Sequence, residues 1–225
     1  MTLSASKVAI QLTHIDYNLF VSVQPIELIG DNRLGEKAVN YANMKDHFNE
    51  IGFFVASEIL KLDSPSKRAD MISQFISISK ACIKIFNFNS AYAILAGLGM
   101  TSVSRLKESW KRVPKKKILS KQKIDALYSM EDNYKNYKEK VMEACSQPHA
   151  IIPYLGLYSK YLFALEQGTK TMIDGMINFE KMRMIYSQLK VHSLPFFFPF
   201  VFTFFPSKTG NSCSSGATNE PQLCY

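Results

Sequence analysis

The residue types that most often carry catalysis are present in this chain but are not arranged for it. The four histidines, His14, His47, His149 and His192, show no partnered spacing. No GxSxG nucleophile elbow, HExxH zinc motif or glycine-rich phosphate loop occurs. We therefore expect no covalent enzyme chemistry, no metal site and no cofactor.

Cysteine usage points to a reducing compartment. The four cysteines, Cys82, Cys145, Cys213 and Cys224, form no CxxC pair. The first twenty residues interrupt their apolar positions with polar ones and lack the apolar run of a secretory signal. Reduced thiols in the cytosol are the simplest interpretation.

The most charged segment is the stretch 105–123, which carries nine basic residues and one acid in a chain of net charge +8. Such a stretch is typical of a polyanion-binding or nuclear-import patch. The alternative is a solvated helix end and loop. We favour the second interpretation and expect no nucleic-acid partner, because no aromatic residues alternate with the charges as a single-strand platform requires.

Apolar residues recur at helical spacing through most of residues 1–190, which predicts an all-α fold. In the clearest helix Ser64 is placed to cap the N-terminus and Pro65 fits the first helical position. One stripe of that helix is apolar: Met71, Ile72, Phe75, Ile78, Cys82 and Ile85. Further helices are expected over 41–61, 90–98, 102–113, 120–128, 134–144, 155–166 and 178–189.

The helical pattern stops after Leu189, so we divide the chain into a domain of residues 1–189 and a divergent tail of residues 190–225. The tail begins with the run Leu194–Pro206, which holds seven Phe and three Pro among thirteen residues. This run is shorter than the roughly 20 residues that a membrane-spanning helix needs. The tail is expected to be disordered or poorly packed.

Three segments of the domain are more informative than the rest. The first is the turn Asn87–Ser90, which leads into an apolar helix and by itself needs to be no more than an N-cap. The second is 131–137, where Tyr134 and Tyr137 are expected on one helix face. The third runs from 152 to 189, where Gly168 ends one helix and Asn178 begins another, which predicts a helical hairpin.

Taken in this order, the segments resemble the catalytic domain of guanine-nucleotide exchange factors for Ras-type small GTPases. The resemblance starts at the A-x-Q-L-T pattern of Ala9–Thr13 and covers most of the chain. It continues through Asp16–Phe20, Gln24–Leu28, His47–Glu50, Val55–Ile59 and Lys67–Ala69, then through the three segments above to about Leu189.

The resemblance implies an all-helical domain that holds a GTPase while a protruding hairpin opens its nucleotide site. On the first hairpin helix Lys160, Phe163 and Gln167 share a face. The resemblance implies that Phe163 is an apolar wedge near the metal site of the GTPase. Gln167 stands where the family commonly has an acid, although Glu166 is adjacent. Positions expected to contact the GTPase are Asn89, Tyr134, Tyr154 and Arg183, the last of which would brace the hairpin or touch the partner.

The expected partner is a Ras-family small GTPase of Ras, Rap or Ral type, and the expected location is the cytoplasm, with membrane proximity only through the lipid-anchored GTPase. Family domains continue past the second hairpin helix with further helices, whereas this chain changes character at about Lys190. We therefore hypothesise a truncated or alternatively spliced product. The alternative function is a GTPase-binding module or decoy that has lost exchange activity.

Overall fold

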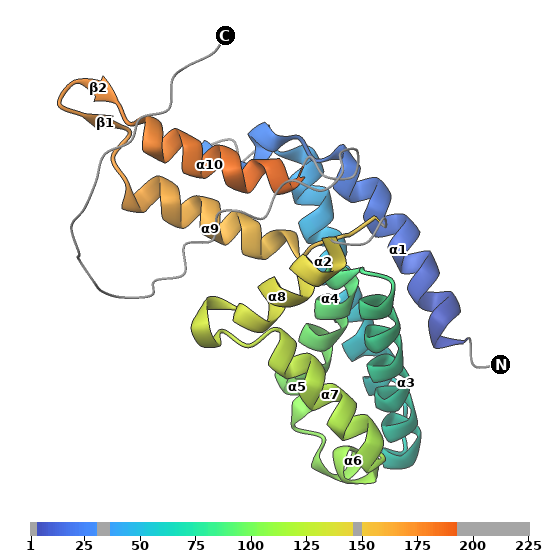
Figure 1. Cartoon of the computed structure of the whole chain (residues 1–225). Coiled ribbons are helices and arrows are strands. Elements are labelled where there is room, and N and C mark those ends of the chain that lie inside the picture. Colours follow the sequence, from blue (N-terminus) through green and yellow to red (C-terminus); the bar gives the residue numbers. More distant parts are fainter. Residues whose placement is uncertain (1–3, 31–36, 146–149, 193–225) are drawn as a thin grey trace.

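Helices form almost all of the regular structure, as the sequence predicts. The computed structural model describes residues 4–30, 37–145 and 150–192 (Figure 1). Its helices are α1 (Ala5–Ser22), α2 (Val39–Leu60), α3 (Pro65–Lys84), α4 (Phe88–Gly99), α5 (Thr101–Ser104), α6 (Lys107–Arg112), α7 (Lys115–Leu127), α8 (Lys135–Cys145), α9 (Leu155–Gly168) and α10 (Phe179–His192). Short 3₁₀ turns occupy Pro25–Leu28 and Glu131–Asn133, and a small hairpin pairs β1 (Met172–Ile173) with β2 (Met176–Ile177).

The main core lies where α2, α3 and α4 pack together, with α1 lying against α3. Two glycines allow α2 and α4 to approach closely. A Cβ added at Gly97 of α4 would lie 2.5 Å from the backbone oxygen of Gly52 on α2 and 2.9 Å from Cβ of Val55. The crossing therefore depends on the missing side chain at Gly97, because backbone atoms occupy the space that it would need.

The caps expected from the sequence are in place. The Ser64 hydroxyl accepts a hydrogen bond from the backbone N–H of Lys67, with Pro65 at the first helical position. The Asn87 side chain accepts one from the backbone N–H of Ser90 at the start of α4. These bonds satisfy amide donors that a helix start otherwise leaves without partners.

Three local expectations are wrong. The helix expected over 102–113 is divided between α5 and α6, because Leu106 adopts a non-helical backbone and turns its side chain onto the core. The indole N–H of Trp110 then donates to the Val103 carbonyl across the break. The helix expected over 120–128 begins earlier, at Lys115, and Tyr134 precedes α8 in a left-handed conformation instead of sharing a helix face with Tyr137.

The helices α9 and α10 form a hairpin that projects from the body, with β1 and β2 at its tip (Figure 1). Asp174 and Gly175 both have positive φ between the paired strands, which is the backbone of a type I′ turn. Gly168 is the last residue of α9, and the Asn178 side chain accepts from the backbone N–H of Lys181 at the start of α10. The predicted hairpin is therefore present, with a strand pair that the sequence did not predict.

A lysine latch closes the far end of the hairpin. The Lys181 side chain is buried, and its ammonium donates to the backbone oxygens of Glu166 at 2.9 Å and Thr169 at 2.7 Å, and to the Thr171 hydroxyl at 2.9 Å. Two of these acceptors are carbonyls at the end of α9, where a cation is favoured by the helix dipole. The latch fixes the start of α10 against the end of α9.

No helix within the described ranges is long and apolar enough to cross a membrane. Cys82 and Cys145 are free thiols, and the environment of Cys82 is fully buried. The expected tail from residue 190 on, with the run Leu194–Pro206, Cys213 and Cys224, falls outside the described residues except for the last residues of α10.

Candidate functional site

The outer face of α9 presents the three residues that were predicted to act together. Lys160, Phe163 and Gln167 are all exposed, and half of the Phe163 surface (51%) is open to solvent. An exposed phenylalanine on a projecting helix can bury apolar area against a partner. The arrangement can therefore offer an apolar side chain between a cation and an amide.

The loop before α8 joins this face. The Lys160 ammonium lies 5.4 Å from the centre of the Tyr134 ring, which is within cation–π range. The neighbouring Tyr161 hydroxyl donates to the Asn133 side-chain oxygen at 2.6 Å. Two predicted site residues from different elements, Lys160 and Tyr134, are thus brought into contact.

Tyr154 sits at the base of the hairpin in a cluster of aromatic rings. Its ring stacks on Phe48 with centroids 5.3 Å apart and lies 4.6 Å from Tyr92. Its backbone N–H donates to the buried hydroxyl of Tyr137 at 2.8 Å. Burial raises the pKa of Tyr154 to about 12, so the phenol stays protonated at physiological pH. Tyr154 therefore anchors α9 to α2, α4 and α8.

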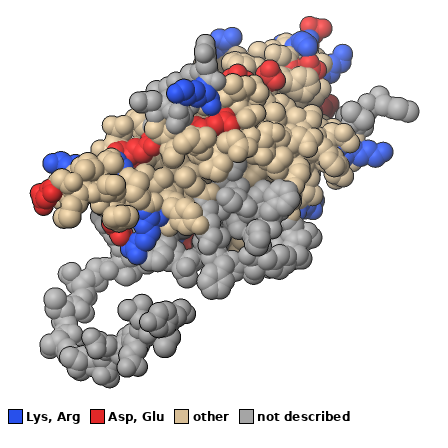
Figure 2. All heavy atoms as spheres, turned by 90° about the horizontal axis from the view of Figure 1, so that it is seen from above, with Lys and Arg blue, Asp and Glu red and all other residues tan. Residues whose placement is uncertain are grey.

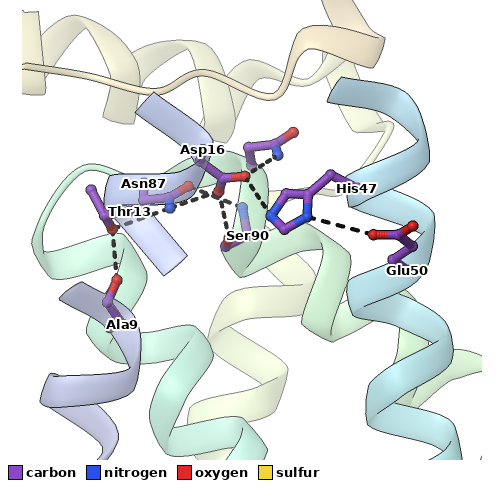
Figure 3. Close-up of polar contacts among 8 residues, drawn as sticks. Ala9, Thr13, Asp16, His47, Glu50, Asn87 and Ser90 are labelled. Carbon is purple, nitrogen blue, oxygen red and sulfur yellow. Dashed lines mark hydrogen bonds and ion pairs between the residues drawn. The ribbon is translucent and has the colours of Figure 1, made fainter. Parts of the chain in front are cut away.

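Figure 3 shows a buried polar hub around Asp16, and the Asn89 side chain donates to this carboxylate at 3.2 Å. Asp16 is fully buried, and its carboxylate accepts hydrogen bonds from the side chains of Asn87, Asn89 and Ser90. The Nε2 atom of His47 lies 3.5 Å from the same carboxylate. Asn89 is only 2% exposed, and the described contacts give its amide a role inside the hub.

The hub is connected to the hairpin through backbone pairing. The N–H of Phe88 donates to the carbonyl of Ile152 at 2.9 Å, and the N–H of Ile152 donates to the carbonyl of Phe86 at 3.0 Å. The loop that Asp16 holds through Asn87 is therefore also the loop on which the hairpin base rests. The orientation of α9 depends on contacts that begin at α1.

Arg183 lies on the exposed side of α10 and makes an ion pair with Glu180 one turn earlier, at 2.7 Å. The described contacts do not join it to Lys160 or Tyr134. On α9, Glu166 is engaged by the body, because its carboxylate accepts the backbone N–H of Gly30. Gln167, the next residue, remains on the open face.

The tip of the hairpin is apolar and open. Its exposed large side chains are Met172, Ile173, Met176, Ile177 and Phe179. Figure 2 views the molecule from above and shows a mostly uncharged surface, over which Lys, Arg, Asp and Glu are scattered singly or in small groups. The hairpin is therefore suited to an interface with burial of apolar surface.

Sequence reasoning did not identify the residues that position the site. Asp16 lies on the inner face of α1 with the buried Ala9 and Phe20, and an acid among apolar positions is a weak signal for a buried polar centre. Lys181 gives no signal beyond its place three residues after the capping Asn178. Tyr161 is one of eleven tyrosines, and only the structure shows its contacts with Asn133 and with the Lys138 ammonium.

The structure is an all-α body with a projecting, latched hairpin whose exposed face is apolar, an arrangement that suits a protein interface. The family model described as the RasGEF domain matches residues 7–183, and the chain belongs to this family. It is 34% identical over 185 residues to Ras guanine nucleotide exchange factor D of Dictyostelium discoideum, covering 81% of this chain and 27% of that protein.

Two mammalian proteins are similar to the chain to the same degree. Human Rap guanine nucleotide exchange factor 6 is 35% identical over 193 residues, which cover 84% of this chain and 12% of that protein. Mouse Ras-specific guanine nucleotide-releasing factor 2 is 32% identical over 189 residues, which cover 82% of this chain and 16% of that protein. The chain thus spans at most about a quarter of the length of these curated relatives.

Proposed function

We propose that this chain promotes GDP release and GTP loading on a Ras-family small GTPase by placing its helical hairpin at the nucleotide site. Membership of the RasGEF family supports the activity class. The observation that carries the proposal is the exposed Phe163 at the centre of a rigidly based hairpin, beside the contact between Lys160 and Tyr134.

The mechanism needs no covalent chemistry. A small GTPase holds its nucleotide with a phosphate-binding loop, Mg²⁺ and two switch segments, so release is slow until these contacts weaken. A factor that binds the nucleotide-free state best must, by linkage, lower the affinity of the complex for nucleotide. Incoming nucleotide expels the factor by the same coupling. The abundant nucleotide therefore sets the direction of exchange.

The residues take separate parts in this mechanism. Phe163 supplies an apolar side chain that obstructs the metal site, with Lys160 and Gln167 on the same face of α9. Tyr134 and Arg183 contact the GTPase beside the hairpin. Tyr154 and Asn89 are also expected to contact the GTPase, and at the hairpin base they take part in the ring cluster and the Asp16 hub, which hold α9 in place. An inserted side chain can open the nucleotide site only if the helix that carries it is held more rigidly than that site.

The test is release of a fluorescent guanine nucleotide from purified Ras, Rap and Ral proteins, with and without the full chain. We expect faster release from at least one of them and no effect on unrelated GTPases. The GTPase whose nucleotide release is accelerated is the substrate of this chain. If no GTPase of the panel responds to a folded, helical sample, the proposed exchange activity is wrong.

A binding measurement on the same panel separates exchange from the decoy function. An exchange factor binds nucleotide-free GTPase much more tightly than the GDP-bound form, and added GDP dissociates the complex. A decoy binds both forms alike and leaves release unchanged. Equal affinity for the two forms would therefore replace the exchange function with the decoy.

A further inference from the structure

The strongest concentration of positive charge lies on α6 and α7, at the opposite end of the molecule from β1 and β2 (Figure 1). The exposed basic residues of this end are Arg105, Lys107, Lys111, Arg112, Lys115, Lys116 and Lys123. The site described above uses none of them. Their position raises the question of which negatively charged partner they face.

The outer surface of α7 combines these charges with an exposed apolar residue. Six exposed positions fall on one side of the helix, and we name them the α7 outward face: Lys115, Lys116, Leu119, Gln122, Lys123 and Ala126. Leu119 is 58% exposed at the centre of the three lysines. The opposite side packs into the body through the buried Ile124 and the half-buried Ile118.

The three lysines of this face are not used to hold the fold. Within the described residues, acids pair with Lys111 and Lys121, through Glu108 and Asp125, and not with these three. Lys115 and Lys116 also stand in the first turn of α7, where a cation is disfavoured by the helix dipole. Their charge is therefore available to an external partner.

The chemistry of the α7 outward face fits an anionic lipid surface better than a nucleic acid. Clusters of Lys and Arg on a surface helix attract anionic headgroups, and the exposed Leu119 adds an apolar side chain among the three lysines. Single-stranded nucleic acid requires aromatic rings for base stacking. Trp110 of α6 is half-buried, its indole N–H donates to the Val103 carbonyl, and the Lys121 ammonium lies over its ring.

We propose that the α7 outward face, with the basic residues of α6 beside it, docks this chain on the anionic surface of a membrane. Lys115, Lys116 and Lys123 attract the negatively charged headgroups, and Leu119 enters between them. The contact is independent of the proposed exchange activity, because the hairpin lies at the other end of the molecule.

The experiment is co-sedimentation of the full chain with vesicles of phosphatidylcholine alone or with about 30% phosphatidylserine. The test variant is the triple substitution Lys115→Glu, Lys116→Glu and Lys123→Glu. The matched control, Lys7→Glu, Lys45→Glu and Lys67→Glu, makes the same change of net charge at exposed positions of α1, α2 and α3. Glutamate at the start of α7 suits the helix dipole, so the test variant should fold.

We expect binding to the anionic vesicles only, with a partition coefficient that falls at least tenfold in the α7 variant and much less in the control. Leu119→Gln should lower binding without changing the charge, and binding should weaken as salt rises from about 0.1 M to about 0.5 M. Phe163→Ala should bind as the unchanged chain does.

Three results would overturn the proposal. The first is no binding to anionic vesicles at low salt. The second is an equal loss in the two triple variants, which would mean that net charge and not this face is responsible. The third is binding that survives the α7 substitutions, because the contact would then lie elsewhere in the chain. Binding of an RNA oligonucleotide, lost in the α7 variant while vesicles do not bind, would reassign the face to nucleic acid.

Discussion

Single buried polar side chains set the geometry of the hairpin. Lys181 ties the end of α9 to the start of α10, and Asp16 organises the loop on which the hairpin base rests. Both side chains are buried, whereas Phe163 is exposed. Their contribution is to stability and orientation, so their substitution should alter the folded state before it alters any contact with a partner.

Replacing Lys181 by methionine should loosen the hairpin tip. The change keeps the length of the side chain but removes three hydrogen bonds and leaves two carbonyls of α9 without their donor. We expect a loss of about 2–3 kcal/mol in the free energy of unfolding and faster hydrogen exchange of amides in 169–178. Lys170→Met, an exposed change on the same hairpin, is the control. Equal exchange rates in the two variants would contradict the latch.

Replacing Asp16 by asparagine should disrupt the hub. The new amide would point a donor at the Asn87, Asn89 or Ser90 donors that the carboxylate now satisfies. We expect a loss of about 2–4 kcal/mol in unfolding free energy, measured by urea denaturation. Asp70→Asn on the exposed side of α3 should be nearly silent. A loss below about 1 kcal/mol for Asp16→Asn would show that the hub is not energetically important.

At the scale of elements, the crossing of α2 and α4 determines whether the core closes. Gly97→Ala would place a methyl group 2.5 Å from the Gly52 backbone oxygen, so the helices must separate. We expect a loss of about 1–3 kcal/mol in unfolding free energy. Gly99→Ala, two residues later on the same helix, meets nothing within 4 Å and should leave stability unchanged or higher. The prediction is wrong if the two variants unfold at the same urea concentration.

Much of the element structure could be predicted from local signals. Ser64 with Pro65, Asn87, Gly168 and Asn178 each mark a helix end through the chemistry of the residue itself. The division between α5 and α6 could not be predicted, because it is decided by packing of Leu106 on the core.

The hub and the ring cluster were beyond prediction for a related reason. Asp16 meets its partners across 71 to 74 residues of chain, and no local pattern specifies such a pairing. By contrast, the exposed face of α9 followed from helical spacing alone, since Lys160, Phe163 and Gln167 recur at its period. The sequence therefore predicts which residues share a face better than it predicts what holds that face in place.

At the scale of the whole molecule, a cluster of tyrosines joins α4, α7, α8 and α9. Tyr92, Tyr128, Tyr137 and Tyr154 contact one another ring to ring. Burial raises the pKa of each phenol in this cluster, and raises the pKa of Tyr154 and Tyr161 to about 12. The cluster therefore couples the packing of the hairpin base to pH in the alkaline range.

The sign of this coupling predicts alkaline unfolding. Below about pH 10 the phenols are protonated in both the folded and unfolded states, so the packing is fully stable. As pH rises from about 10 to about 12, the unfolded chain loses protons that the folded state retains, and stability falls. Tyrosinate absorbance and helical circular dichroism should change together in this range.

Two variants test the assignment. Tyr154→Phe should lose less stability between about pH 10 and about pH 12 than the unchanged chain, because one of the phenols with a raised pKa is gone. Tyr186→Phe, at an exposed position of α10, should lose as much stability over this pH range as the unchanged chain does. Titration of all tyrosines near pH 10 with helix content intact would refute the coupling.

The central claim is that the open face of α9 accelerates nucleotide release from a GTPase. The most direct measurement compares the release rate of fluorescent GDP from the responsive GTPase with the unchanged chain, Phe163→Ala and Phe53→Ala. Phe53 is a matched control, since it is an exposed phenylalanine on α2, 63% open to solvent. We expect a release rate lower by about tenfold or more for Phe163→Ala and an unchanged rate for Phe53→Ala. Equal rates for the unchanged chain and Phe163→Ala would contradict it.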